Sequence, residues 1–95
     1  MHIKRDYKQV FDIVQRVILA WDPYALVSHG APPNEFDQEV AQIVARVPKC
    51  QTESDVSRAV SEIFSQSFSP DDFSLDKCHD IGVSLFAVLR DSRYV

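Results

Sequence analysis

The sequence WDPYALVSHGAPPNEFD, residues 21–37, organises the chain, because strong helical patterns flank it on both sides. It contains the only Trp, the only Asn and three of the five Pro. Pro23 has no N–H and disfavours helical backbone at the residue before it, so the first helix is predicted to end near Trp21. The pair Pro32-Pro33 then interrupts regular structure a second time. The segment is therefore predicted to be a long connection between two helices.

Apolar residues at three- and four-residue steps predict the main helices. The first is expected over residues 5–20 and the second over 35–47, where Pro48 ends it. A third begins after Thr52, and the last runs over 75–90. Because the last pattern is apolar over most of its circumference, we expect that helix to be the most buried. The predicted fold class is all-α: a single compact bundle of four main helices plus one or two short helical turns, forming one domain over residues 1–95.

Two positions carry finer packing predictions. Gly82 lies inside the last predicted helix, where it costs about 1 kcal/mol relative to Ala. We therefore expect a neighbouring backbone to come close to Gly82. In the third helix, the apolar stripe forms the buried face and Ser57 is predicted to face water.

Four residues are predicted to be structural caps at helix starts, namely Asp22, Asn34, Thr52 and Ser69. Asp22 and Ser69 each precede a Pro, which suits the first helical position. The turn after Ser69 is expected to stop near Phe73. Thr52 is followed three residues later by Asp55, a variant of the capping box.

Short motifs in the same segments resemble a known family. Trp21-Asp22-Pro23, Gly30-Ala31-Pro32 and Glu35-Phe36-Asp37 resemble the signatures of the YugE-like family of small helical bacterial proteins. That family has a motif close to Asp-Glu-Tyr-Asp, so Asn34 stands in place of an acid and Phe36 in place of Tyr. Residues 68–78 are also similar. The family is one of unknown function, so the resemblance implies a helical fold and no activity.

Composition excludes several classes of protein. With 95 residues, of which 45% are hydrophobic, the chain is large enough for one globular core. No apolar run approaches the ~20 residues that span a bilayer, and the first residues lack the hydrophobic stretch of a secretory signal. We expect a cytoplasmic protein. Its two Cys, Cys50 and Cys78, are expected to be free thiols, since neither has metal-site spacing.

No convincing catalytic or metal-binding pattern is present. Acidic side chains and His29 cluster in residues 22–39, but the paired Glu-x-x-His ligands of metal-binding helices are missing. Cys78-His79-Asp80 are consecutive, and consecutive residues on a helix point about 100° apart, so they cannot form a triad. We predict no catalytic residue, no metal site and no cofactor, and hence a protein that is not an enzyme.

The distribution of charge points to a class of partner. The net charge is −4, and residues 17–45 contain four acids but no Lys or Arg. Such surfaces repel nucleic acid and attract basic proteins. The predicted partner-binding residues are acids that share one side of the bundle if the second and last helices are neighbours: Glu35, Glu39, Asp71, Asp72 and Asp76.

The leading hypothesis is a small protein-binding domain, in its sharpest form an immunity-type protein that neutralises a basic toxin, such as a nuclease, by covering its active site. The alternative is a housekeeping helical domain that binds a small ligand or a metal near residues 21–37. A third is a structural or regulatory subunit. Trp21 is expected to belong to the core in each case.

Overall fold

The computed structural model describes residues 3–32 and 34–92, which contain helices and no strand. The helices are α1 (Ile3–Trp21), α2 (Asp37–Arg46), α3 (Glu53–Ser67) and α4 (His79–Asp91). Two short 3₁₀ turns, η1 (Pro23–Ala25) and η2 (Val47–Lys49), follow α1 and α2. The predicted all-helical fold is confirmed. Pro33, part of the predicted interruption by Pro32-Pro33, lies outside the described residues.

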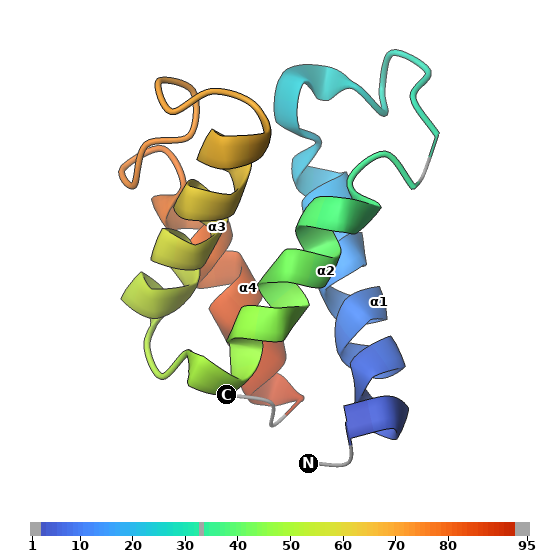
Figure 1. Cartoon of the computed structure of the whole chain (residues 1–95), viewed down its shortest axis with the longest axis vertical. Helices are drawn as coiled ribbons and strands as arrows, with labels where there is room; N and C mark the ends of the chain where they lie inside the picture. Colours follow the sequence, from blue (N-terminus) through green and yellow to red (C-terminus); the bar gives the residue numbers. More distant parts are fainter. Residues whose placement is uncertain (1–2, 33, 93–95) are drawn as a thin grey trace.

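Successive helices run in opposite directions (Figure 1). α1 packs against α2 and α4, and α3 packs against the same two helices. α2 and α4 therefore lie diagonally across the bundle, so the condition named above for a shared acidic side, that the second and last helices are neighbours, is not met. The two long connections, residues 22–36 and 68–78, meet at one end, here called the loop end (Figure 1). The start of α1, η2 and the end of α4 lie at the opposite end.

Apolar stripes from all four helices form one core. Each stripe follows the helical period, so its side chains leave water together when the helices pack. Fully buried members include Val10, Val14 and Ile18 of α1, Val40 of α2, Val60 and Phe64 of α3, and Leu85 and Leu89 of α4.

The apolar arc of α4 is buried along one side only. Leu85 and Leu89 are in the core, whereas Val83 and Phe86 are half-buried and Val88 is exposed. Four of the 13 residues of α4 are buried, against four of the ten in α2 and six of the 15 in α3, so α4 is not the most buried helix. Like the other helices, it packs against two neighbours, which leaves its outer side in water. The prediction that this helix is the most buried, made from its apolar circumference, was therefore wrong.

A close crossing of α3 and α4 occurs at Ser57 and Gly82. A Cβ added at Gly82 would lie 2.7 Å from the Cα of Ser57, so only Gly fits. This confirms the expected approach of a neighbouring backbone. Ser57 itself is only 2% exposed, which corrects its predicted place on the water-facing side. Its small side chain permits the crossing, and its hydroxyl donates to the carbonyl of His79 (3.5 Å).

Two helices begin later than predicted. Asn34 accepts the Asp37 N–H through its backbone carbonyl (3.1 Å), which forms a turn, and α2 starts only at Asp37. The helix is preceded by Phe36 without a side-chain cap, so the prediction that Asn34 is the cap was wrong. The last helix was predicted to begin at residue 75, but residues 75–78 form a turn in which the backbone carbonyl of Ser74 accepts the Cys78 N–H (3.0 Å). α4 begins only at His79.

Two further predicted caps, Thr52 and Ser69, differ in outcome. Thr52 accepts the Asp55 N–H (3.2 Å) and the Asp55 carboxylate accepts the Thr52 N–H (3.2 Å), which completes a capping box on α3. Ser69 precedes turns and not a helix, so it caps nothing. The rings of Phe68 and Phe73 on either side pack at 5.8 Å, and this contact shapes the segment as a loop.

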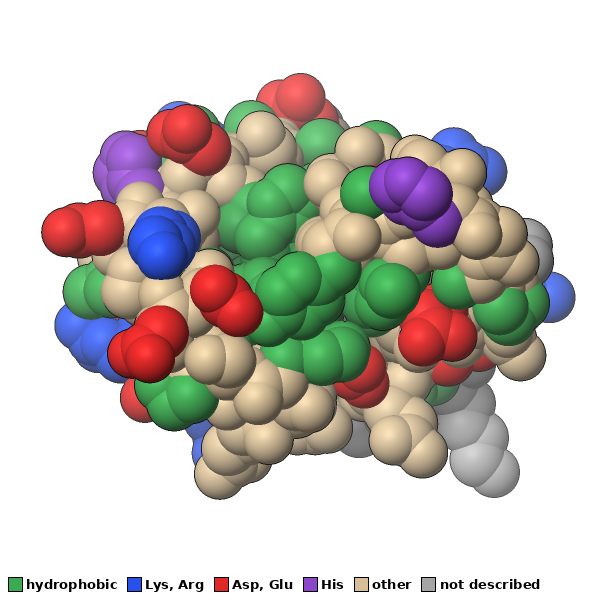
Figure 2. All heavy atoms as spheres, turned by 90° about the horizontal axis from the view of Figure 1, so that it is seen from above, with side chains coloured by type: hydrophobic (Ala, Val, Ile, Leu, Met, Phe, Trp, Pro, Cys, Tyr) green, Lys and Arg blue, Asp and Glu red, His purple; other side chains and the backbone are tan. Residues whose placement is uncertain are grey.

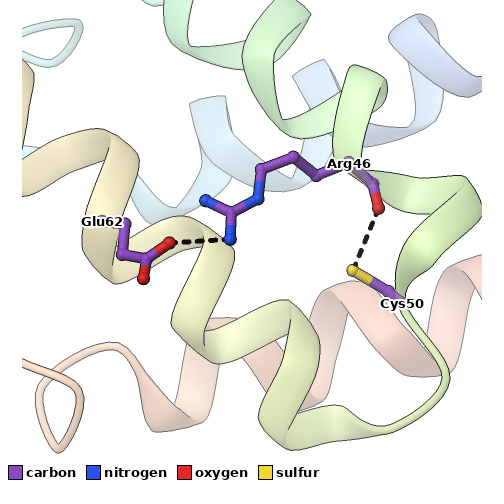
Figure 3. A network of polar contacts seen from close by, with 3 residues as sticks. All are labelled: Arg46, Cys50 and Glu62. Carbon is purple, nitrogen blue, oxygen red and sulfur yellow. Dashed lines mark hydrogen bonds and ion pairs between the residues drawn. The ribbon is translucent and has the colours of Figure 1, made fainter.

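One ion pair joins α2 to α3 among the described residues. Arg46 donates to Glu62 at 2.7 Å, and the carbonyl of Arg46 accepts the thiol of Cys50 at 3.3 Å (Figure 3). Both charged side chains are substantially exposed. Pairs of this kind contribute only about 0.2–1 kcal/mol, so the apolar core accounts for most of the contact between these helices.

Candidate functional site

Six aromatic side chains form a continuous group at the loop end, here called the aromatic cluster: Trp21, Tyr24, Phe36, Phe64, Phe68 and Phe73. Phe73 lies at its centre, with ring centroids 5.3 Å from Phe64, 5.4 Å from Tyr24 and 5.8 Å from Trp21. Several of these pairs are edge-to-face, the arrangement that the ring quadrupoles favour. The cluster therefore joins both loops to the ends of α1 and α3.

The aromatic cluster extends from the core to the surface. Phe36, Phe64 and Phe73 are buried, whereas 49% of Tyr24 and 37% of Phe68 are exposed. Seen from above, the loop end shows an apolar patch with carboxylates around it (Figure 2). Exposed apolar patches bordered by polar residues are typical of binding surfaces. We take this patch, represented by Tyr24 and Phe68, as the candidate site.

The backbone that presents Tyr24 is in an unusual conformation. Asp22, Tyr24 and Ala25 all have positive φ, at 51°, 61° and 55°. Residues other than Gly rarely adopt this region, at a cost of about 1–3 kcal/mol each. The segment is therefore held by its surroundings rather than by local preference.

Asp22 supplies part of that support. Its carboxylate accepts the Val27 N–H (2.8 Å), the Ser28 N–H (3.0 Å) and the Ser28 hydroxyl (2.5 Å). These bonds lower the pKa of Asp22 below its usual 3.8, and the bond from the Ser28 hydroxyl has the largest effect. Asp22 thus ties the turn to residues five and six positions ahead. It makes no side-chain cap bond to η1, which corrects its predicted role as a helix cap.

A single hydrogen bond joins the two loops at the surface. The Tyr24 hydroxyl donates to the Asp72 carboxylate at 2.7 Å. This bond, followed by burial and the charge of Asp72, raises the pKa of Tyr24 above 10.0. Nearby, the Lys77 ammonium donates to the backbone carbonyl of Asp71 (2.7 Å), which holds the same loop. Both aspartate carboxylates remain exposed at the surface.

The predicted acidic residues divide into exposed and buried ones. Glu35, Asp71, Asp72 and Asp76 are exposed and belong to the two loops. Glu39 is only 7% exposed, so it is removed from the predicted binding surface. Burial, with a smaller effect of the Glu35 charge, raises the pKa of Glu39. The loops, and not neighbouring helices, bring the exposed carboxylates to one end.

Asp37 has a structural partner. It accepts a hydrogen bond from the Gln15 side-chain amide at 2.8 Å, which joins the start of α2 to α1. In the Glu35-Phe36-Asp37 motif, Phe36 is therefore in the core and Asp37 joins two helices, while Glu35 alone is exposed.

The described residues contain no group of three or more His, Cys, Asp or Glu side chains that could hold a metal ion. The ring of His29 lies 2.7 Å from the Ala25 carbonyl, within its own loop. Burial raises the pKa of the thiols of Cys78 and Cys50, so neither is an activated nucleophile. His79 and Asp80 are exposed while Cys78 is buried, as their positions on a helix predict.

A shallow, open hollow lies between α1 and α4, beside Trp21. Trp21 and Ile81 supply apolar surface, Arg16 and Lys77 supply positive charge, and Asp80 supplies one carboxylate. Trp21 is half-buried and packs on Phe64 and Phe73, so it belongs mainly to the core.

The sequence did not single out Phe68 as a surface residue. Its exposure follows from the backbone at the end of α3, where Phe68 has φ −129° and ψ −92° and leaves the helix. The available signal was the density of aromatic residues beside Pro-containing loops, at Tyr24, Phe68 and Phe73.

No helix in the described part of the chain has both the length and the apolar character needed to cross a membrane.

Comparison with known proteins gives one match. The profile of a family described as a domain of unknown function, DUF1871, matches residues 13–94, which include all of the loop end. No curated protein and no solved structure matches the chain.

Proposed function

The chain belongs to the DUF1871 family, a family of unknown function, and from the loop end we propose that it is a non-enzymatic domain that binds a basic partner protein. The observation that carries this proposal is the apolar patch of Tyr24 and Phe68 with exposed carboxylates around it. Aromatic residues at the centre and polar residues at the rim are the usual anatomy of a protein interface.

Charge supports the choice of partner. The two loops, residues 22–36 and 68–78, contain five acids and a single Lys or Arg, Lys77. No salt bridge joins Asp71 or Asp72 to a cation within the described ranges. Carboxylates at a rim accelerate the association of a basic protein and suppress the binding of acidic ones. The exposed rings of Tyr24 and Phe68 would then supply most of the binding free energy of the complex.

The sharper form of the proposal is an immunity-type protein acting in the cytoplasm, whose loop end covers the basic active site of a toxin. The small size of the chain and its acidic surface suit this role. The resemblance to the YugE-like family rests on motifs in the same loop. Because that family is one of unknown function, the resemblance implies no activity for the chain.

The alternative, a helical domain with a small ligand, is favoured only by the hollow beside Trp21, where Arg16 and Lys77 outnumber the one acid, Asp80. A ligand there raises the melting temperature of the purified protein, whereas a protein partner at the loop end associates more slowly when Asp71 and Asp72 are neutralised.

Photo-crosslinking in the native cells tests the location of the interface. A photoreactive amino acid at Phe68 is expected to capture a basic protein, which is then purified and its affinity measured directly. The matched control carries the same group at Lys49, an exposed residue at the opposite end of the bundle. Equal capture from both positions would place the interface elsewhere.

Charge-neutral variants test the electrostatic part. Glu35→Gln, Asp71→Asn and Asp72→Asn are expected to lower the association rate of the captured protein and to reduce its dependence on salt. Asp12→Asn, an exposed acid on α1, is the control. If all four variants behave like the unmodified protein, the acidic rim has no role in binding. For the immunity form, growth during co-expression with the captured protein is expected to require Asp71 and Asp72.

A further inference from the structure

The loop end places an exposed tyrosine ring directly beside a carboxylate. Tyr24 is half exposed, and its hydroxyl is held by Asp72 at 2.7 Å. Ring contacts with Phe68 (5.5 Å) and Phe73 (5.4 Å), both edge-to-face, hold the orientation of the Tyr24 ring.

The Tyr24 hydroxyl occupies only one oxygen of the Asp72 carboxylate, Oδ2. A carboxylate has about four acceptor positions, so Asp72 can accept further hydrogen bonds. The next acid, Asp71, is also exposed, and Lys77 binds its backbone carbonyl and not its carboxylate. Lys77 is the one Lys or Arg in loops 22–36 and 68–78, and the Asp71 carbonyl holds its ammonium. Among the described residues, no Lys or Arg forms a salt bridge with the Asp72 carboxylate, which is therefore open to a cation that reaches Tyr24.

We propose that this site binds one arginine side chain of the partner, with its guanidinium on the Tyr24 ring and its N–H groups donating to Asp72. The inference rests on the proposed function, because it assigns the residue that anchors the partner. Arginine fits better than lysine for two reasons. Its planar guanidinium stacks on an aromatic face, and its fork of donors matches a carboxylate. The apolar stem of the arginine would lie against Phe68, the other exposed ring.

Small probes test the site without knowledge of the partner. Isotope-labelled protein is titrated with N-acetyl-arginine methylamide and, separately, with the matching lysine and citrulline derivatives. Citrulline keeps the shape of arginine but carries no charge. We expect arginine to shift the Tyr24, Phe68 and Asp72 signals with millimolar affinity, lysine to bind at least about threefold more weakly and citrulline not to bind.

Three variants separate the parts of the site. Tyr24→Leu removes the ring and is expected to abolish the arginine response. Tyr24→Phe keeps the ring but frees Asp72, so it should retain most of the response, and Asp72→Asn should weaken it at least about threefold. The control is Tyr7→Leu, which removes an exposed tyrosine from the first half of α1, away from the loop end (Figure 1), and should change nothing. Signal dispersion in each spectrum shows whether the variant remains folded.

Each outcome decides between the two proposals. No response to arginine, or an equal response to citrulline, overturns the arginine site. If the captured protein still requires Tyr24 and Asp72 in that case, binding at the loop end stands and its anchor is a different side chain. If arginine binds but the captured protein is indifferent to both residues, the site exists and the proposed function at the loop end fails.

Discussion

Tyr24 and Asp72 are 48 positions apart in the chain, and the hydroxyl of the first donates to the carboxylate of the second at 2.7 Å. This bond links the turn after α1 to the loop before α4 at the surface of the aromatic cluster. The two loops can therefore act as one surface, although α2 and α3 separate them along the chain.

Asp72→Asn is expected to lower the pKa of Tyr24 toward 10.0, because the bond to Asp72 is the largest cause of the raised value. A raised tyrosine pKa means that the folded state keeps its proton longer than the unfolded state. The associated stability is present below pH 10.0 and is lost as the pH rises through the folded-state pKa. The phenolate absorbance of the two proteins over an alkaline titration measures the shift. Asp71→Asn is the control, and an equal shift in that variant would contradict the assignment.

Gly82→Ala is expected to destabilise the protein by about 1–3 kcal/mol, because the new methyl group would overlap Ser57. An ordinary Gly to Ala change in a helix stabilises by about 1 kcal/mol, so the sign itself is diagnostic. Urea unfolding followed by circular dichroism gives the value. Adding Ser57→Gly should recover part of the loss, since it removes the side chain nearest to the added Cβ. A Gly82→Ala protein as stable as the original would mean that the two helices can separate at no cost.

Glu39→Gln is expected to raise the urea midpoint at about pH 8 and to have little effect near pH 4. Burial raises the folded-state pKa of Glu39 above 4.5, so the folded protein binds more protons than the unfolded chain in the window above that value. Stability is therefore lost as the pH rises through this window, and a neutral side chain removes the penalty. The comparison requires unfolding curves of both proteins at several pH values. A lower midpoint for Glu39→Gln at alkaline pH would show that the ionised carboxylate stabilises the fold.

Asp22→Ala and Asn34→Ala form a matched pair in one loop. The first removes an acceptor of three hydrogen bonds and should lower the urea midpoint and the protection of the Val27 and Ser28 amides from exchange. The second removes an exposed side chain that caps no helix, so its effect should be within about 0.5 kcal/mol. Since the pKa of Asp22 is lowered, its contribution is present above pH 3.8 and is lost as the pH falls through the folded-state pKa. Equal losses of stability in the two variants would contradict the different roles assigned to Asp22 and Asn34.

Much of the fold could be predicted from local pattern. The period of the apolar residues identified the four helices and their core faces, Pro23 marked the end of α1, and Thr52 with Asp55 marked the start of α3. These features depend on residues a few positions apart, for which sequence spacing and spatial proximity are nearly the same. The close approach of another backbone at Gly82 could be inferred as well, because Gly inside a helix costs stability unless the missing side chain makes room for a neighbour.

The candidate site could be predicted only in part. Glu35, Asp71, Asp72 and Asp76 are exposed as expected, but Glu39 is buried because α2 turns that side of its first turn inward. Ser57 was misplaced for a related reason, since its burial follows from how closely α4 approaches α3. Neither effect is visible in the period of a single helix.

By itself, the sequence determined the helical class, the positions of the helices and the excess of acidic over basic residues in the loops. Only the tertiary structure decided that α2 and α4 are diagonal, that both long loops lie at one end, and that Tyr24 meets Asp72 there. The physical reason is that helix formation follows local spacing, whereas helix order and loop contacts depend on how all apolar faces are buried at once. The aromatic cluster illustrates this, because six rings that are scattered over residues 21–73 become neighbours only when the bundle closes.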